Sequence, residues 1–416
     1  MSTSNTSLSE TGTSAPLALN LDPEQLASCT ACGMCLPHCP TYRVTGEEAA
    51  SPRGRLALMS AVQKSGIAEP SFATHMELCV LCRGCETACP AGVPFGHLME
   101  ETRATLAKQS TKTKTPVSTP ISQWLRFGYK LLHRRRLLRA AVMLGAVAQR
   151  LRLMPKRLPS ISLRQGKLRP SGEPESDDKA VWLFTGCIMD AAMRDVHRVS
   201  QKVIEAAGVK VGFPDSRASC CGSLHRHAGL ADDATKLARR TMAALPGTAP
   251  ILVNSAGCSA VLKDYGNILG TEEARQFSSR VKDIHEWLAE QTANSFSSAS
   301  QSNATPSSRP RIAILDPCHL RHAQGVHISV RETLQPYVEI VELDDQGMCC
   351  GAGGAYSFTH PDTATAIASR KIAAIQRSGA NQVVAANPGC ILHLQKPLAT
   401  LGITIAHPIE VINNHL

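Results

Sequence analysis

Acidic residues are missing from one long stretch of this 416-residue chain. Between Thr102 and Gly172 there are 17 Lys or Arg residues and no Asp or Glu, although the whole chain has 44 basic and 34 acidic residues. The remainder therefore carries 27 basic against 34 acidic residues. A basic arm is thus attached to an acidic body. Nucleic-acid binding is a poor explanation of the arm, because no recognised binding motif accompanies its charge.

The chain also lacks readable signals for export or membrane insertion. Residues 1–20 are rich in Ser and Thr, without the basic and apolar segments of a signal peptide. The longest apolar run of the basic stretch, Ala140 to Ala148, is far shorter than the roughly 20 residues that span a bilayer. We therefore expect a cytoplasmic protein, in a reducing compartment where clustered cysteines are metal ligands more often than disulfides.

Cysteine, by contrast, is abundant, with 16 residues. Half of them lie in two runs of four that have the same spacing. Each run has the spacing C-x2-C-x2-C-x3-C-P, which is typical of 4Fe-4S ferredoxins. Because the last cysteine of each run ligates the other cluster in two-cluster ferredoxins, we expect two ligand sets. The first is Cys29, Cys32, Cys35 and Cys89, and the second is Cys79, Cys82, Cys85 and Cys39. Pro40 and Pro90 should stop the backbone from continuing as helix and turn the fourth thiolate toward the neighbouring cluster.

Paired zinc sites and a disulfide framework are the two alternatives for these runs. Zinc sites usually show C-x2-C pairs separated by a longer stretch, without the third cysteine and the Cys-Pro ending. Nothing in the sequence marks a secreted, disulfide-rich protein. The runs therefore favour two 4Fe-4S clusters and an electron carrier. Arg53 and Arg55 lie between the runs, where cations could stabilise reduced clusters or meet an acidic partner.

Within the basic arm, residues 121–139 resemble a basic amphipathic helix, with Trp124 and several leucines among arginines. Such a helix can lie on an anionic membrane surface. It can equally pack its apolar stripe on a neighbouring domain or subunit while its cations stay in water. We expect the helix to dock on a domain or subunit, and membrane contact and a solvated linker are the alternatives.

Beyond residue 179 a second internal repeat appears. Short apolar runs typical of buried strands end near cysteine or glycine, and helical patterns follow them, which predicts α/β units. Four cysteines recur at offsets of 129 to 132 residues, and each repeat contains Cys-Cys-Gly. We name these the first and second Cys-Cys-Gly repeats, at residues 179–291 and 311–416. Their cysteines are candidates for an additional metal centre, with structural scaffolding as the alternative: Cys187, Cys220, Cys221, Cys258, Cys318, Cys349, Cys350 and Cys390.

Gly222 and Gly351 should allow the backbone to turn directly after the two adjacent thiols. Histidines 225, 227, 319 and 322 follow these cysteines and could donate hydrogen bonds to sulfur, although such residues are more often ordinary polar groups. No residue looks placed to abstract a proton or hydride from a substrate, so we assign no catalytic residue.

This combination resembles the iron-sulfur subunit of bacterial glycolate oxidase. Five short sequence segments support this resemblance: Cys39-Pro-Thr-Tyr-Arg-Val-Thr-Gly46, Ser51-Pro-Arg-Gly-Arg55, Asp316-Pro-Cys-His-Leu-Arg-His-Ala-Gln324, Thr359-His-Pro-Asp362 and His407-Pro-Ile-Glu410. The resemblance implies a membrane-associated oxidoreductase in which two FAD-containing subunits oxidise glycolate and this subunit passes electrons toward a quinone. In the wider superfamily each repeat ends in Cys-x2-Cys. Here Ser255 and Asn387 replace the first cysteine of that pair, which leaves four of the five thiols of a noncubane cluster.

The alternatives are an iron-sulfur subunit of a glycerol-3-phosphate or D-lactate dehydrogenase and, from another class, a zinc-stabilised basic binding module. The expected fold is mixed, with an α-helical two-cluster ferredoxin domain followed by two α/β repeats. We expect a location at the inner face of the cell membrane. The expected organisation is a flexible tail at 1–20, the ferredoxin domain at 21–103, the basic arm at 104–178, the first repeat at 179–291, a low-complexity linker at 292–310 and the second repeat at 311–416.

Overall fold

The computed structural model describes residues 15–110, 121–153, 161, 166–177, 179–294, 309–345 and 347–416. Most of the expected tail at 1–20 and most of the linker at 292–310 lie outside these residues. The chain divides into two compact units, which are described separately. The first comprises the chain up to residue 81 with 85–123 and 226–230, and the second comprises 82–84, 124–225 and 231–416.

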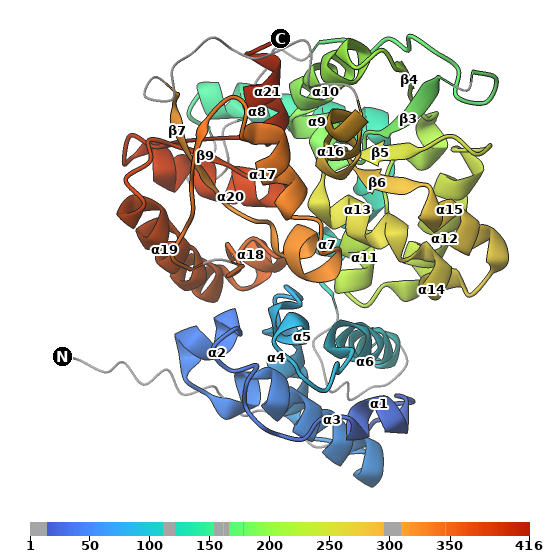
Figure 1. Ribbon diagram of the computed structural model, residues 1–416. Coiled ribbons are helices and arrows are strands. Elements are labelled where there is room, and N and C mark those ends of the chain that lie inside the picture. Colours follow the sequence, from blue (N-terminus) through green and yellow to red (C-terminus); the bar gives the residue numbers. More distant parts are fainter. Residues whose placement is uncertain are drawn as a thin grey trace. The chain divides into compact units, whose positions relative to one another are not determined.

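The N-terminal part is built from short helices, as the ferredoxin pattern predicts (Figure 1). Several helices begin with proline, whose fixed φ suits the first helical turn. Asp22 and Ser51 add side-chain caps, since their oxygens accept backbone N–H groups of the first turn. The elements are β1 (Ala15–Pro16), α1 (Pro23–Ala27), α2 (Pro40–Thr45), η1 (Glu48–Ala50), α3 (Pro52–Ser65), β2 (Ile67–Ala68), α4 (Pro70–Glu77), α5 (Gly84–Thr87) and α6 (Phe95–Gln109).

Two details of this unit differ from the sequence-based expectation. Pro40 does not keep the chain out of a helix, because it is the first residue of α2 and Cys39 is the N-cap. Proline is well suited to that position, where its missing N–H has no helical partner to lose. In addition, α6 continues to Gln109, beyond the boundary predicted at residue 103. The core beneath these helices contains Met59, Phe72 and Leu98.

Each Cys-Cys-Gly repeat contains a four-stranded parallel sheet with helices around it, as predicted (Figure 1). The first sheet has the order β4-β3-β5-β6 and the second β10-β9-β7-β8. Read in the opposite direction, the second order matches the first strand for strand. The first repeat consists of β3 (Ala180–Phe184), α9 (Ile188–Ala192), α10 (Arg194–Ala206), β4 (Lys210–Gly212), η2 (Ser216–Ala218), α11 (Ser223–His227), α12 (Ala231–Ala243), β5 (Ile251–Val253), α13 (Ala256–Lys263), α14 (Tyr265–Leu269), α15 (Glu272–Ser279), β6 (Val281–Asp283) and α16 (Ile284–Asn294).

The second repeat follows the same plan with fewer helices. Its elements are β7 (Arg311–Ile314), the π-helical turn η5 (His319–Ala323), α17 (Ile328–Leu334), β8 (Glu339–Val341), α18 (Tyr356–Thr359), α19 (Pro361–Arg377), β9 (Gln382–Val384), α20 (Pro388–Ala399), β10 (Thr404–Ala406) and α21 (Pro408–Asn413).

The two repeats share one hydrophobic core. A single cluster of buried side chains includes Leu183 and Leu252 from the first sheet and Ile314 and Val384 from the second. Two further clusters each belong to one repeat. Because burial of apolar surface is the main favourable term in folding, the shared cluster ties the stability of each repeat to the other.

The basic arm forms two helices, α7 (Gln123–Leu132) and α8 (Arg135–Arg150), and not one helix over 121–139. In the second unit the arm packs on the first repeat. Arg135 makes an ion pair of 2.8 Å with Asp190, which also pairs with Arg194 at 2.6 Å. Ser219 donates a hydrogen bond to the carbonyl of His133 at the break between the helices. One face of the arm is therefore fixed to the α/β body.

Candidate functional site

The two ferredoxin runs form loops with the same unusual backbone. On either side of the second cysteine of each run, the residues have left-handed φ angles. These are Ala31 at 56° and Gly33 at 82° in the first run, and Leu81 at 57° and Arg83 at 60° in the second. Non-glycine residues rarely adopt such angles, and they concentrate at functional sites. The matching angles show that the two runs share a wrapped loop conformation.

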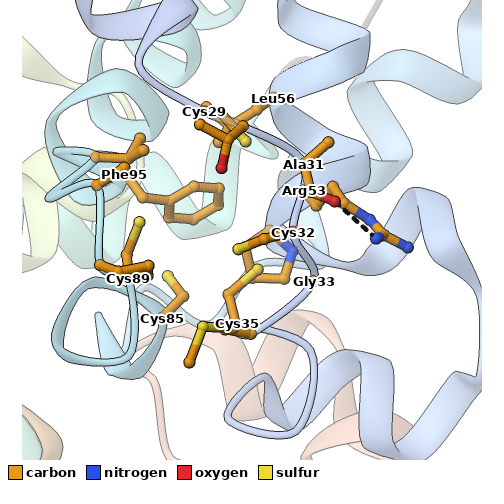
Figure 2. A pocket seen from close by; sticks show the side chains of 16 residues that line it. Cys29, Ala31, Cys32, Gly33, Cys35, Arg53, Leu56, Cys85, Cys89 and Phe95 are labelled. Carbon is orange, nitrogen blue, oxygen red and sulfur yellow. Dashed lines mark hydrogen bonds between the residues drawn. The ribbon is translucent and has the colours of Figure 1, made fainter.

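The first predicted ligand set lines one cavity. Cys29, Cys32, Cys35 and Cys89 surround it, and Cys85 of the second run reaches it as well (Figure 2). Apolar side chains, including Leu56 and Phe95, complete the wall. Two thiols of the second run, those of Cys85 and Cys89, therefore reach the three thiols of the first run, and the assignment of Cys89 as the fourth ligand stays a prediction. A cavity lined by soft sulfur ligands and apolar groups has the chemistry that a 4Fe-4S cluster requires.

Arg53 ties the first loop to α3 at the edge of this cavity. Its Nη1 donates to the carbonyl oxygen of Ala31 at 3.0 Å, next to Cys32 (Figure 2). Its Nε also pairs with Glu48 at 2.7 Å. The ion pair with Arg53 lowers the pKa of the Glu48 carboxyl. Arg53 thus supports the left-handed turn at Ala31 and places a cation beside the thiols.

Arg55 is buried next to a cysteine of the second predicted set. Its side chain is 1 % exposed. The guanidinium donates to the carbonyl of His75 at 2.7 Å and to the hydroxyl of Thr41 at 3.2 Å, and its Nη1 lies 4.0 Å from the sulfur of Cys39. It is therefore no solvated loop residue, and its charge acts on the Cys39 sulfur in a poorly hydrated setting.

Three cysteines of the second ligand set lie in the first unit. Cys39, Cys79 and Cys85 are buried in the first unit, whereas Cys82 belongs to the segment 82–84 that groups with the second unit. This set therefore stays a prediction. Sequence reasoning missed Arg103, whose guanidinium donates to the carbonyls of Met76 and Cys79 at 2.7 and 2.6 Å. No motif marks this arginine, although it is the first cation of the acid-free stretch.

In the Cys-Cys-Gly repeats the structure brings the predicted thiols together. The sulfur atoms of Cys221 and Cys258 are 3.3 Å apart, and those of Cys350 and Cys390 are 2.9 Å apart. Cys187 contacts Cys220 in the first repeat, and Cys318 contacts Cys349 in the second. None of these eight cysteines forms a disulfide. Gly222 and Gly351 both have φ of 86°, which confirms that glycine permits the turn after the paired thiols.

The two sets of thiols differ in their electrostatics. In the first repeat, the hydrogen bond with Cys220 and burial raise the pKa of Cys221 well above its usual value. In the second repeat, the hydrogen bond with Cys349 and the nearby His319 lower the pKa of Cys318 to about 6. The first set thus favours neutral thiols, while the second can present a thiolate, which is the form that binds metals. Among the described residues, no group of three or more His, Cys, Asp or Glu side chains is spaced to hold a single metal ion.

The histidines near these cysteines have different surroundings. His319 Nδ1 lies 3.6 Å from the sulfur of Cys318, as the sequence suggested. His322 instead bonds to the carbonyl of Gly347 at 2.7 Å. His225 is buried against the ring of Tyr129, and His227 lies 4.0 Å from Glu100. His319 is therefore the one of the four for which the described contacts show a sulfur neighbour.

Comparisons with known proteins agree with this division of the chain. Residues 25–93 match the family described as 4Fe-4S dicluster domain, and residues 181–263 and 312–395 match the cysteine-rich domain family. The chain is 31% identical to the probable glycolate oxidase iron-sulfur subunit of Bacillus subtilis, over 92% of this chain and 91% of the relative. It is 29% identical to the glycolate oxidase iron-sulfur subunit of Escherichia coli, over 94% of both chains.

A shorter relative is lactate utilization protein A of Geobacillus kaustophilus. It is 26% identical over 56% of this chain and 98% of its own length. Among the residues that the structure describes, no helix is long and apolar enough to cross a membrane.

Proposed function

Because the chain belongs to the family of glycolate oxidase iron-sulfur subunits, we propose that it relays electrons from flavin subunits to a quinone or another acceptor. In this proposal two FAD-containing partner subunits oxidise glycolate to glyoxylate, which releases two electrons and two protons. The observation that carries the proposal is the cavity at which Cys89 of the second run meets Cys29, Cys32 and Cys35 of the first.

We assign one 4Fe-4S cluster to Cys29, Cys32, Cys35 and Cys89, and the other to Cys39, Cys79, Cys82 and Cys85. When bound, such clusters accept and release single electrons, so the subunit connects a two-electron flavin to a one-electron acceptor. The chain's own residues hold and tune these sites. Arg53 fixes the first loop through the Ala31 carbonyl, and Arg55 places its charge beside Cys39, where it favours the reduced state.

The Cys-Cys-Gly thiols are the place for any further metal centre, and the second repeat is the better candidate. Its Cys318 has a pKa lowered to about 6 by Cys349 and His319, and Asn387 directs its amide toward the sulfur of Cys390 at 3.7 Å. The contacting sulfur atoms would have to separate to admit a metal. Metal analysis of Cys349→Ala and Cys220→Ala variants tests this point, because a further centre in the second repeat would be lost from the first variant alone.

The proposed location is the cytoplasmic face of the cell membrane, without a membrane-spanning segment among the described residues. An exposed basic arm supports this location, since anionic lipids attract clustered Lys and Arg side chains.

The proposal is tested with the complete complex, purified without oxygen. We expect about eight irons per copy of this chain and EPR signals of reduced clusters within one turnover after glycolate is added. A Cys89→Ser variant should lose the signal of the cluster held by the first run. Protein that binds zinc and no iron, or flavin subunits that turn over while the clusters stay oxidised, would contradict the relay function.

D-Lactate is the second candidate substrate of the complex, because a lactate utilization protein is similar to more than half of this chain. The same experiment distinguishes D-lactate from glycolate as the substrate of the complex. Cluster reduction by D-lactate, with none by glycolate, would keep the relay and replace the substrate. Glycerol 3-phosphate serves as a third substrate in the same assay.

A further inference from the structure

The outer face of the basic arm carries large apolar side chains that the fold leaves uncovered. On α7, Trp124 is 85% exposed and Phe127 61%, and on α8, Leu144 is 70% exposed. The arm surface is defined here by these exposed apolar residues: Trp124, Phe127, Leu137, Leu144, Val147, Leu151 and Leu153. In a helix with 3.6 residues per turn, positions 137, 144, 147 and 151 share one face. The α8 part of the arm surface is therefore one stripe along the helix and not a scatter of single side chains.

The opposite face of the same helices is already occupied. Leu132, Leu138 and Ala146 are buried in the second unit, and Arg135 is held by Asp190. The arm is thus fixed to the first repeat through one apolar stripe while a second stripe faces away. Packing within the described part of the fold accounts for the first stripe and leaves the second without an occupant.

The charges beside the arm surface indicate what covers it. Lys130, Arg134, Arg136, Arg150 and Arg152 are exposed around the stripe. No acidic residue occurs between Thr102 and Gly172. Apolar side chains bordered by cations, with an aromatic ring at one end, match the layered chemistry of a bilayer of anionic lipids. There the apolar groups enter the acyl boundary and the cations meet the phosphates.

We infer that the arm surface lies in the headgroup region of an anionic membrane, with Trp124, Phe127 and Leu144 inserted and Arg134 and Arg136 against lipid phosphates. This deepens the peripheral location proposed above, and it rests on that proposal for the side of the membrane. The helices lie in the plane of the interface and do not cross it, as the absence of a spanning helix among the described residues requires. Arg135 takes no part, because its guanidinium is bound to Asp190.

Sedimentation of the cluster-loaded full chain with lipid vesicles tests the inference. The probes are vesicles of phosphatidylcholine alone and vesicles containing equal parts of phosphatidylglycerol. We expect binding to the anionic vesicles, weakened by salt, and little binding to the neutral ones. A Trp124→Ser/Phe127→Ser/Leu144→Ser variant should bind at least tenfold more weakly. An Arg134→Gln/Arg136→Gln variant should lose about fivefold in affinity for each cation, or about twenty-five-fold in all.

Matched controls separate the arm surface from general effects of substitution. Phe358→Ser removes an aromatic ring that is 68% exposed on α18, and Arg239→Gln/Arg240→Gln removes two exposed cations from α12. Both controls should bind vesicles as the unchanged chain does.

Unchanged lipid binding by the triple serine variant would overturn the inference. So would a wild-type chain that ignores anionic vesicles, or a serine variant that fails to bind the flavin subunits while it still binds lipid. EPR spectra of the same samples keep the two proposals apart. If the cluster signals are normal but the chain does not bind lipid, only the membrane contact is rejected. If the chain binds lipid but its clusters are not redox-active, only the relay function is rejected.

Discussion

The side chains of Ser255 and Asn387 meet where the two Cys-Cys-Gly repeats join. The Ser255 hydroxyl lies 3.5 Å from the Asn387 amide oxygen, which also accepts the backbone N–H of Gly257 at 3.3 Å. A backbone hydrogen bond from Ala256 to Ala386, at 3.0 Å, runs beside them. These are the two positions at which the resemblance described in the sequence analysis leads us to expect cysteine. At both positions the structure shows a polar contact between the repeats.

Removal of this contact should loosen the joint between the repeats. We expect Asn387→Ala to lower the free energy of unfolding by about 1–2 kcal/mol, because the N–H of Gly257 and the Ser255 hydroxyl lose an acceptor. Urea unfolding followed by the fluorescence of the buried Trp182 and Trp287 measures the change. Asn267→Ala, which removes an exposed amide, is the control. Equal unfolding free energies of the two variants would show that the Asn387 amide does not stabilise the contact between the repeats.

The turns after the paired cysteines should tolerate substitution unequally. A Cβ atom at Gly351 would lie 2.6 Å from the carbonyl oxygen of Ala364, whereas at Gly222 the nearest atom, the Ala234 oxygen, is 3.3 Å away. Both positions have φ of 86°, so alanine strains each backbone by about 1–2 kcal/mol. We expect Gly351→Ala to cost about 3 kcal/mol or more and Gly222→Ala about half as much. Thermal unfolding of both variants compares them, and a larger effect at Gly222 would be inconsistent with these contacts.

Arg55 should raise the reduction potential of the cluster that we assign to Cys39 and its partners. The buried cation favours the state with the additional electron, so Arg55→Gln is expected to shift that potential downward by tens of millivolts. A redox titration followed by EPR measures the shift, and the iron content shows whether the cluster is retained. Lys64→Gln removes an exposed cation from the same helix and should leave the potential unchanged. An upward shift in Arg55→Gln would contradict the assigned role.

Acid should destabilise the joined repeats through buried histidines. Burial lowers the pKa of His197 to about 4 and that of His285 to about 3. Below the usual value of 6.5 the unfolded chain therefore takes up protons that the folded chain does not, and stability falls as the pH falls toward 4. Asp283 acts in the opposite direction, because burial raises its pKa to about 7 and the folded state holds its proton.

A His285→Gln variant isolates one contribution to this pH dependence. Between pH 7 and 5.5 it should lose about 1 kcal/mol less unfolding free energy than the unchanged chain. Urea midpoints at several pH values, with the exposed His415→Gln as control, provide the measurement. Parallel pH profiles for His285→Gln and the unchanged chain would exclude this histidine as a source of acid sensitivity.

The sequence predicted the features that depend on spacing and repetition. The cysteine runs identified the two loops, and the offsets near 130 residues identified two sheets of equal topology. Short apolar runs located the strands closely, as at Ala180–Phe184, because buried parallel strands are apolar on both faces. The pairing of Cys89 with the first run follows from ferredoxin chemistry and stays a prediction, because Cys85 lines the same cavity.

Long-range partners escaped prediction, because the sequence pattern does not show which residues meet across the fold. Arg135 looked like one of several equivalent arginines, yet Asp190 binds it 55 positions away. Arg55 looked like a loop cation and is buried, because the carbonyl of His75 and the hydroxyl of Thr41 accept hydrogen bonds from its guanidinium. The break between α7 and α8 at His133 carries no proline or glycine to signal it.

The core that the two sheets share also bears on how such a chain arose. One repeat alone would expose the face formed by Leu183, Leu252 and their neighbours, which the other repeat covers here. A single-repeat ancestor would need a second copy of itself to shield that surface. Tandem duplication and fusion of its gene would then have converted a homodimer contact into an internal one. With the halves joined in one chain, each can diverge, and Ser255 and Asn387 take different places in the contact between them.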